Sequence, residues 1–119
     1  MTPKFRAWDK KKNGWFDDGG NLWLQLNGNI DFGWNGEVMD DYTDRVILLQ
    51  YTGLCDKNGK EVYEGDILFN DHHNEYGLVS FEEGKFSVLW ETTGDDLFEN
   101  CDVLELSGNI YENPELLED

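Results

Sequence analysis

The stretch Asp56-Lys57-Asn58-Gly59 matches the centre of a calcium-binding EF-hand loop. Such a loop requires acidic ligands at its first and last positions. Alignment on Gly59 places Leu54 and Gly65 there, and neither side chain carries an oxygen atom. A β-hairpin explains the same residues better, because Asn-Gly tolerates the positive φ values of a type I′ turn.

Two other stretches carry metal-ligating residue types. His72 and His73 are adjacent, so their side chains would diverge on a strand or a helix. Asp40, Asp41 and Asp44 cluster in an acidic connector expected over residues 37–44, and such acids are usually solvated. We therefore predict no metal site and no cofactor-binding residues.

The two cysteines, Cys55 and Cys101, are too few for a disulfide framework. Cys101 is flanked by Glu99 and Asp102, whose negative charges are expected to raise the pKa of its thiol. The sequence shows no nucleophile–base pair with supporting spacing. It therefore predicts no catalytic residues, a protein that is not an enzyme, and free thiols in a reducing cytoplasm.

The charge of the chain is unevenly distributed. The net charge is −17, and Lys85 is the one basic residue among residues 61–119, against seventeen acidic ones. Direct nucleic-acid binding is disfavoured, because it depends on Lys and Arg contacts to phosphates. The acidic residues either only keep the protein soluble or bind a host protein with a basic surface. The candidate contacts to such a protein are Asp95, Asp96 and Glu99.

Basic residues of the first half gather at Lys10, Lys11 and Lys12, just before Asn13-Gly14. This run is typical of a hairpin tip. It is either solvated or in contact with an acidic partner, including the acidic half of another copy.

Aromatic residues provide one further candidate site. Trp8, Trp15, Trp23 and Trp34 occur in predicted strands of the first half. Trp23 and Trp34 would form part of a platform that stacks a small-molecule ligand, although aromatic residues on alternating strands more often belong to the core.

Hairpin signals dominate the whole chain. Leu22, Leu24 and Leu26 alternate with polar or aromatic residues, and Asn-Gly pairs follow at 27–28 and 35–36. Residues 46–52 form an apolar run expected to be buried on both faces, and Gly65 is expected at a sharp corner with a positive φ and little room for a Cβ.

The second half continues this pattern. We predict a hairpin with arms at residues 76–81 and 86–91, an acidic loop at 92–101 that has room for one helical turn, a last strand at 103–107 and a short helix from Pro114. The predicted fold is all-β: a small SH3-like barrel over residues 46–119, an N-terminal β-hairpin lobe over residues 1–45, and at most short helices. No signal peptide or membrane-length apolar run is evident, so no membrane contact is expected.

Three stretches resemble the YopX family of phage and prophage proteins: FRAWDKKKNGW, LLQYTGLCDKNGKEVYEGDIL and SGNIYENPELL. The resemblance implies a single YopX-like domain over residues 1–119, an all-β fold with SH3-like barrel character, a bacterial cytoplasmic location and a capacity for self-association. It nominates no active site, because the shared residues are mostly turn and strand residues.

These observations predict a non-enzymatic phage or prophage accessory protein that binds a partner protein. The partner is either another copy or a host protein with a basic surface. Two alternatives stay open: an acidic inhibitor or nucleic-acid mimic acting on a host nucleic-acid-binding or defence protein, and a small-molecule binder that uses the N-terminal tryptophans.

Overall fold

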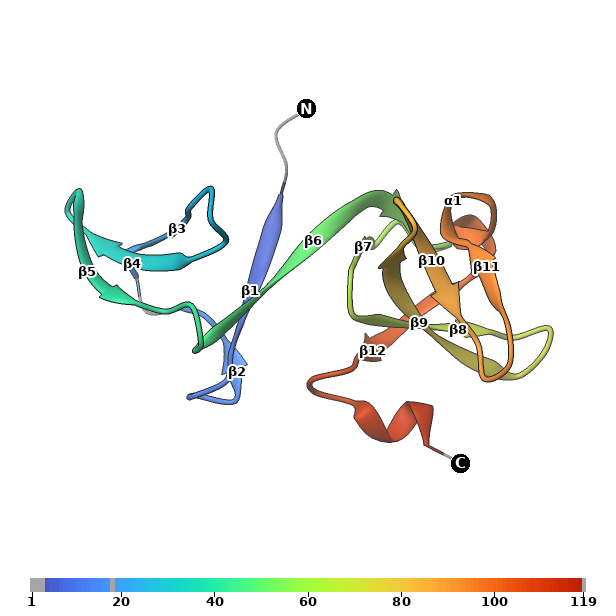
Figure 1. Ribbon diagram of the computed structural model, residues 1–119. Coiled ribbons are helices and arrows are strands. Elements are labelled where there is room, and N and C mark those ends of the chain that lie inside the picture. The colour runs from blue at the N-terminus through green and yellow to red at the C-terminus, as the bar shows by residue number, and fades with distance from the viewer. Residues whose placement is uncertain (1–3, 18, 119) are drawn as a thin grey trace. The chain divides into compact units, whose positions relative to one another are not determined.

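The computed structural model describes residues 4–17 and 19–118. The chain divides into two compact units (Figure 1). The hairpin unit comprises residues 6–48, and the barrel unit comprises residues 4–5 and 49–118. Strand β6 (Val46–Cys55) gives its first three residues to the hairpin unit and the rest to the barrel unit.

The hairpin unit contains two small groups of antiparallel strands. Strand β1 (Phe5–Asp9) pairs with β2 (Gly14–Trp15), with Trp8 opposite Trp15. Strands β3 (Asn21–Leu24), β4 (Ile30–Trp34) and β5 (Glu37–Asp41) form a three-stranded sheet in that order. The prediction of an acidic connector over residues 37–44 is therefore wrong for residues 37–41, because these residues form strand β5 and pair with β4.

Aromatic packing forms the core of the hairpin unit. Ile30, Tyr42 and Val46 are buried, and the rings of Phe32 and Tyr42 stack with 4.9 Å between their centroids. Phe16 packs against both rings at steep angles. These side chains therefore join the end of β2, the β3–β5 sheet and the start of β6 within the hairpin unit.

The barrel unit is built on a curled antiparallel sheet in the order β11-β10-β9-β8-β12 (Figure 1). The strands are β8 (Asp66–Asn70), β9 (Glu75–Glu82), β10 (Lys85–Leu89), β11 (Gly94–Asp96) and β12 (Glu105–Asn109). Strand β7 (Glu61–Tyr63) pairs with β6. Together the curled sheets form a half-barrel.

Helical structure is confined to single turns in the described chain. Helix α1 (Leu97–Asn100) and the 3-10 turn η1 (Cys101–Val103) connect β11 to β12, and the 3-10 turn η2 (Pro114–Leu117) follows β12. The barrel core consists of Val62, Leu68, Val79, Val88, Leu97, Cys101 and Leu104. The predicted all-β fold, with a small barrel in the second half, an N-terminal hairpin extension and only short helices, is confirmed.

The turn at residues 56–59 differs from the expected type I′ geometry. Gly59 has a positive φ of 83°, whereas Asn58 does not. Asp56 Oδ1 accepts hydrogen bonds from the backbone N–H groups of Asn58 and Lys60, both at 2.9 Å. The aspartate side chain therefore sets the turn type, a local effect that the Asn-Gly signal does not include.

Four other local predictions were wrong at least in part. Strand β12 begins at Glu105 rather than Val103, which belongs to η1, and the predicted loop 92–101 contains strand β11. Strand β6 is buried at Val46 and Leu49 but half-buried or exposed elsewhere. Gly65 has the positive φ expected of a sharp corner, but a Cβ there would lie 3.4 Å from Tyr111 and 3.6 Å from Leu49, which are ordinary contacts.

Candidate functional site

The candidate site is the lysine turn, residues 10–13, which connects β1 to β2 in the hairpin unit. Asp9, the last residue of β1, is fully buried. Its Oδ1 atom accepts hydrogen bonds from the backbone N–H groups of Lys11 at 3.0 Å and Lys12 at 3.3 Å. An aspartate at the start of a turn commonly binds the backbone two residues ahead, so this sequence favours the observed geometry.

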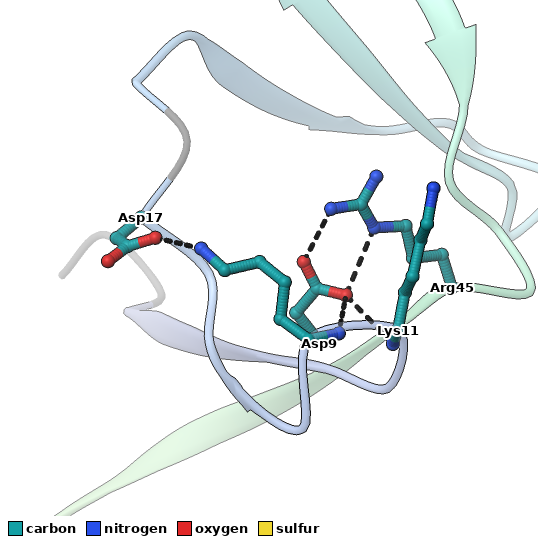
Figure 2. Close-up of polar contacts among 5 residues, drawn as sticks. Asp9, Lys11, Asp17 and Arg45 are labelled. Carbon is teal, nitrogen blue, oxygen red and sulfur yellow. Dashed lines mark hydrogen bonds and ion pairs between the residues drawn. The ribbon is translucent and has the colours of Figure 1, made fainter.

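The Arg45 side chain also binds the Asp9 carboxylate (Figure 2). The guanidinium donates to Asp9 through Nε at 3.0 Å and through Nη2 at 2.7 Å. It also lies over the Tyr42 ring, 4.3 Å from the centroid. The backbone N–H of Lys10 donates to the Arg45 carbonyl at 2.9 Å, so the turn is bonded to this residue through both main chain and side chain.

Electrostatics strongly favour the charged form of Asp9. The two hydrogen bonds from the Arg45 guanidinium lower the pKa of the Asp9 carboxyl to about 2, against the opposing effect of its burial. A bidentate arginine–carboxylate pair fixes orientation as well as charge. The Asp9 carboxylate therefore stays charged, and available to the backbone of the lysine turn, across the physiological pH range.

The turn presents cationic side chains to solvent. Lys10, Lys11 and Lys12 are all exposed, and Lys12 forms an ion pair with Asp17 (Figure 2). A depression of about 470 Å³ adjoins the turn and is lined by Lys10, Lys11, Asp41, Asp44 and Arg45. Within the described residues, the ammonium groups of Lys10 and Lys11 have no ion-pair partner.

Asp9 and Arg45 were not among the residues that the sequence nominated. A sequence signal for Asp9 exists, since Asp directly before a polar turn favours an Asx-type bond to the backbone. Arg45 lies thirty-six positions away in the chain. No local pattern links such a pair, because only the fold brings the two residues together.

The acidic candidates lie together in the barrel unit, and two of them have internal bonds. Asp95 accepts a hydrogen bond from Trp90 Nε1 at 2.7 Å. Asp96 caps α1 through the Phe98 N–H at 2.9 Å and pairs with Lys85 at 3.6 Å. Glu99 is exposed in the first turn of α1. The structure thus gives Asp95 and Asp96 local structural contacts in addition to their charge.

The tryptophan candidates occupy separate surfaces of the hairpin unit. Trp23 pairs with Asp31 across the sheet, and its ring covers Gly33, where a Cβ would lie 2.5 Å from it. Trp34 is 49% exposed and follows Gly33, so it points to the opposite face of β4. Trp8 and Trp15 pack edge to face, 5.0 Å apart. Trp23 and Trp34 therefore do not share one sheet face.

The metal-ligating residue types do not converge. Among residues 4–17 and 19–118, no three His, Cys, Asp or Glu side chains are placed to hold a metal ion. His72 and His73 are exposed in the turn between β8 and β9. The absence of a metal or cofactor stays a prediction.

Cys101 is buried and donates a hydrogen bond from its thiol to the Cys55 carbonyl at 2.9 Å. Burial raises the pKa of this thiol to about 11, with a smaller contribution from the charge of Asp56. The direction agrees with the prediction, although burial rather than the flanking acids is the main cause. Such a thiol stays protonated at neutral pH and is a poor nucleophile.

In the described part of the chain, no helix is long and apolar enough to span a membrane.

Asp41, at the edge of the depression, accepts hydrogen bonds from Thr43, whose hydroxyl lowers the pKa of the carboxyl. The site therefore contains a cationic turn held by Asp9, beside Asp41, whose carboxylate is bonded to Thr43, and Asp44. The exposed ammonium groups of Lys10 and Lys11 could bind an anionic group.

Comparison with known proteins places the chain among solved structures. The crystal structure of protein EF1440 from Enterococcus faecalis is similar, with 30% sequence identity, coverage of 99% of both chains and a TM-score of 0.70. Protein yopX from Bacillus subtilis shares the fold at 22% identity, with coverage of 97% of this chain and 95% of that chain and a TM-score of 0.65. No curated protein matches the sequence.

The family assignment rests on nearly the whole chain. The sequence pattern that defines the YopX protein family matches residues 4–118, which include both units and the lysine turn. The chain therefore belongs to the YopX family.

Proposed function

We propose that this chain is a non-enzymatic protein-binding module, an accessory protein of a phage or prophage, whose lysine turn binds an acidic segment of a partner protein. One observation carries the proposal. The buried Asp9–Arg45 pair fixes the backbone of a turn whose lysine side chains are exposed. The Asp9 carboxylate holds the backbone N–H groups of Lys11 and Lys12, so the lysine side chains project from a defined backbone conformation.

The physical advantage of this arrangement is preorganisation. Binding normally costs conformational entropy when a flexible loop becomes ordered. Here the turn is already fixed by bonds from Lys11, Lys12 and Arg45 to one carboxylate. Only the lysine side chains must be ordered when a partner binds, and their charges also speed the encounter with an acidic surface.

The acidic ligand has two possible sources. One is a host protein, and the other is the acid-rich second half of another copy, in which seventeen acidic residues accompany Lys85. The molar mass of the protein in solution, measured at low and high salt, distinguishes these two sources. A salt-sensitive oligomer that dissociates on the substitutions Lys10→Glu and Lys11→Glu would show that the ligand is another copy. A monomer under both conditions would exclude another copy and leave a different protein as the ligand.

The site itself is tested by NMR titration of isotope-labelled protein with a hexaglutamate peptide. We expect the largest shifts at the backbone amides of residues 10–13, and we expect them to diminish at high salt because exposed charges are screened. Lys57 and Lys60, exposed in the barrel unit, serve as an internal control. Equal or larger shifts around these two residues, or no response at residues 10–13, would contradict the proposal.

A further inference from the structure

The barrel unit contains a groove between the outer face of strand β9 and the C-terminal turn η2. Its volume is about 420 Å³, and its apolar lining includes Tyr76, Leu78, Leu89, Leu116 and Leu117. This volume falls in the range of pockets that hold small ligands or single side chains. The groove lies within one unit and shares no residue with the lysine turn.

The floor of the groove follows from strand alternation. Val79 and Val88 point into the barrel core, so their neighbours Leu78 and Leu89 point outward. Leu78 and Leu89 are directly paired across β9 and β10 and are half-buried. Tyr76 continues the same face and contacts Phe69 with 4.8 Å between the ring centroids. The outer face of the sheet is therefore apolar at this end.

The turn η2 forms the second wall. Pro114 begins it, Leu116 is half-buried, and Leu117 is 37% exposed. An aliphatic side chain left partly exposed beside other apolar residues gains free energy when a partner covers it. Leu78, Leu89, Leu116 and Leu117 are therefore all partly exposed along the groove.

The rim of the groove is acidic. Glu75, Glu91 and Glu118 line it, and no Lys, Arg or His does so among the described residues. The net charge of −17 adds a long-range attraction for cations. The surface therefore combines an apolar floor with a negative rim, and the complementary ligand has an apolar side chain next to positive charges.

From this complementarity we propose that the groove binds a short segment of a partner protein in which one large aliphatic side chain is flanked by Lys or Arg. The aliphatic side chain lies against Leu78, Leu89 and Leu116, and the cations lie beside the glutamates of the rim. This inference goes beyond the proposed function, because it assigns a second surface, in the other unit, with the opposite charge preference.

The experiment measures binding of the pentapeptide Lys-Arg-Leu-Arg-Lys to the full chain by isothermal titration calorimetry. A second peptide with Ser in place of Leu keeps the charge and removes the apolar side chain. We expect the Ser peptide to bind roughly tenfold more weakly, since burial of a leucine side chain is worth at least one decade of affinity. Equal binding of the two peptides would reduce the effect to charge alone and overturn the proposal.

Charge-reversed variants locate the binding surface. Glu75→Lys combined with Glu91→Lys reverses the rim, and Glu82→Lys combined with Glu83→Lys makes the same charge change at the other end of the hairpin. We expect the rim variant to weaken binding about tenfold and the control variant to change it less than about twofold. Circular dichroism melts show whether both variants are folded.

Two further outcomes overturn the inference. Equal weakening by the rim and control variants would show that only net charge matters. Failure of the Leu peptide to bind would also overturn it, and a dimer that the rim variant dissociates would then show that a second copy covers the groove instead.

Discussion

Asp9 keeps its charge although it has no solvent exposure, because the Arg45 guanidinium and two backbone N–H groups replace its hydration. Its pKa of about 2 in the folded chain lies below the ordinary value of 3.8. A carboxyl group whose pKa is lower in the folded than in the unfolded chain stabilises the fold. This stabilisation is complete above the pKa of the unfolded chain and is lost as the pH falls through the pKa of the folded chain. We therefore expect the hairpin unit to lose about 2 kcal/mol between pH 5 and pH 2, at about 1.4 kcal/mol per pKa unit.

The substitution Asp9→Asn tests this pair directly. It leaves the partly buried Arg45 without its counter-charge, which should lower the free energy of unfolding by about 3 kcal/mol at neutral pH. The acid-dependent loss between pH 5 and pH 2 should also shrink. Asp17→Asn removes the exposed ion pair to Lys12 and is the matched control, expected to cost less than about 1 kcal/mol. Denaturant melts with equal losses for both variants would contradict this account.

Gly65 has a φ of 87°, a conformation that other residues adopt only with strain. Its N–H donates to the Val79 carbonyl and its carbonyl accepts from Ile110, so the corner cannot easily relax. Gly65→Val should cost about 2 kcal/mol or more in thermal or denaturant melts. Gly59→Ala, with a similar φ of 83° but open space around it, should cost less. An unchanged midpoint for Gly65→Val would show that the corner is not constrained.

At the scale of elements, Asp56 connects the β6–β7 hairpin to β12. It is 5% exposed, and its Oδ2 atom accepts from the Leu106 N–H at 2.8 Å, while Oδ1 holds the turn. Burial alone would raise the pKa of this carboxyl, but the bonds from the Leu106, Lys60 and Asn58 N–H groups outweigh it, and the pKa is lowered. One carboxylate thus joins a turn to a strand far away in sequence.

Asp56→Ala would leave three backbone N–H groups without this acceptor. We expect it to lower the free energy of unfolding by about 3 kcal/mol, since each lost bond to a charged group costs about 1 kcal/mol or more. Asp71→Ala removes an exposed carboxylate with one ion pair and should change stability by less than about 1 kcal/mol. Hydrogen exchange should also become faster at the Leu106 amide in the first variant, and slow exchange there would argue against the connection.

Turns and strands could be predicted from the sequence where the preferences of neighbouring residues determine them. The hairpin at Glu83-Gly84 has positive φ at both residues, and the Asn35-Gly36 turn has the same geometry, as Gly and Asn signals favour. Strand β11 was missed because Gly94-Asp95-Asp96 has no strand-forming residue, and pairing with β10 alone makes it a strand. The Asp9–Arg45 pair was missed for a similar reason, since its two residues meet only through the tertiary fold.

At the scale of the whole molecule, the charge of −17 opposes the compact state. Raising the salt concentration from about 0.05 M to about 0.5 M shortens the Debye length to a few ångströms and should raise the melting temperature by a few degrees. Calorimetry in a series of NaCl concentrations would show this. A melting temperature that falls with salt would mean that ion pairs such as Lys4–Glu61 outweigh the repulsion among the acids.

The central claim is that a turn fixed by Asp9 and Arg45 presents Lys10 and Lys11 to an acidic partner. The most direct measurement is the affinity of the chain for hexaglutamate by calorimetry, with Lys10→Glu plus Lys11→Glu compared with Lys57→Glu plus Lys60→Glu. Both variants change the net charge equally. The account predicts that the first variant binds at least about tenfold more weakly than the second, since exposed charge contacts contribute up to about 1 kcal/mol each. Equal affinities for the two variants would contradict it.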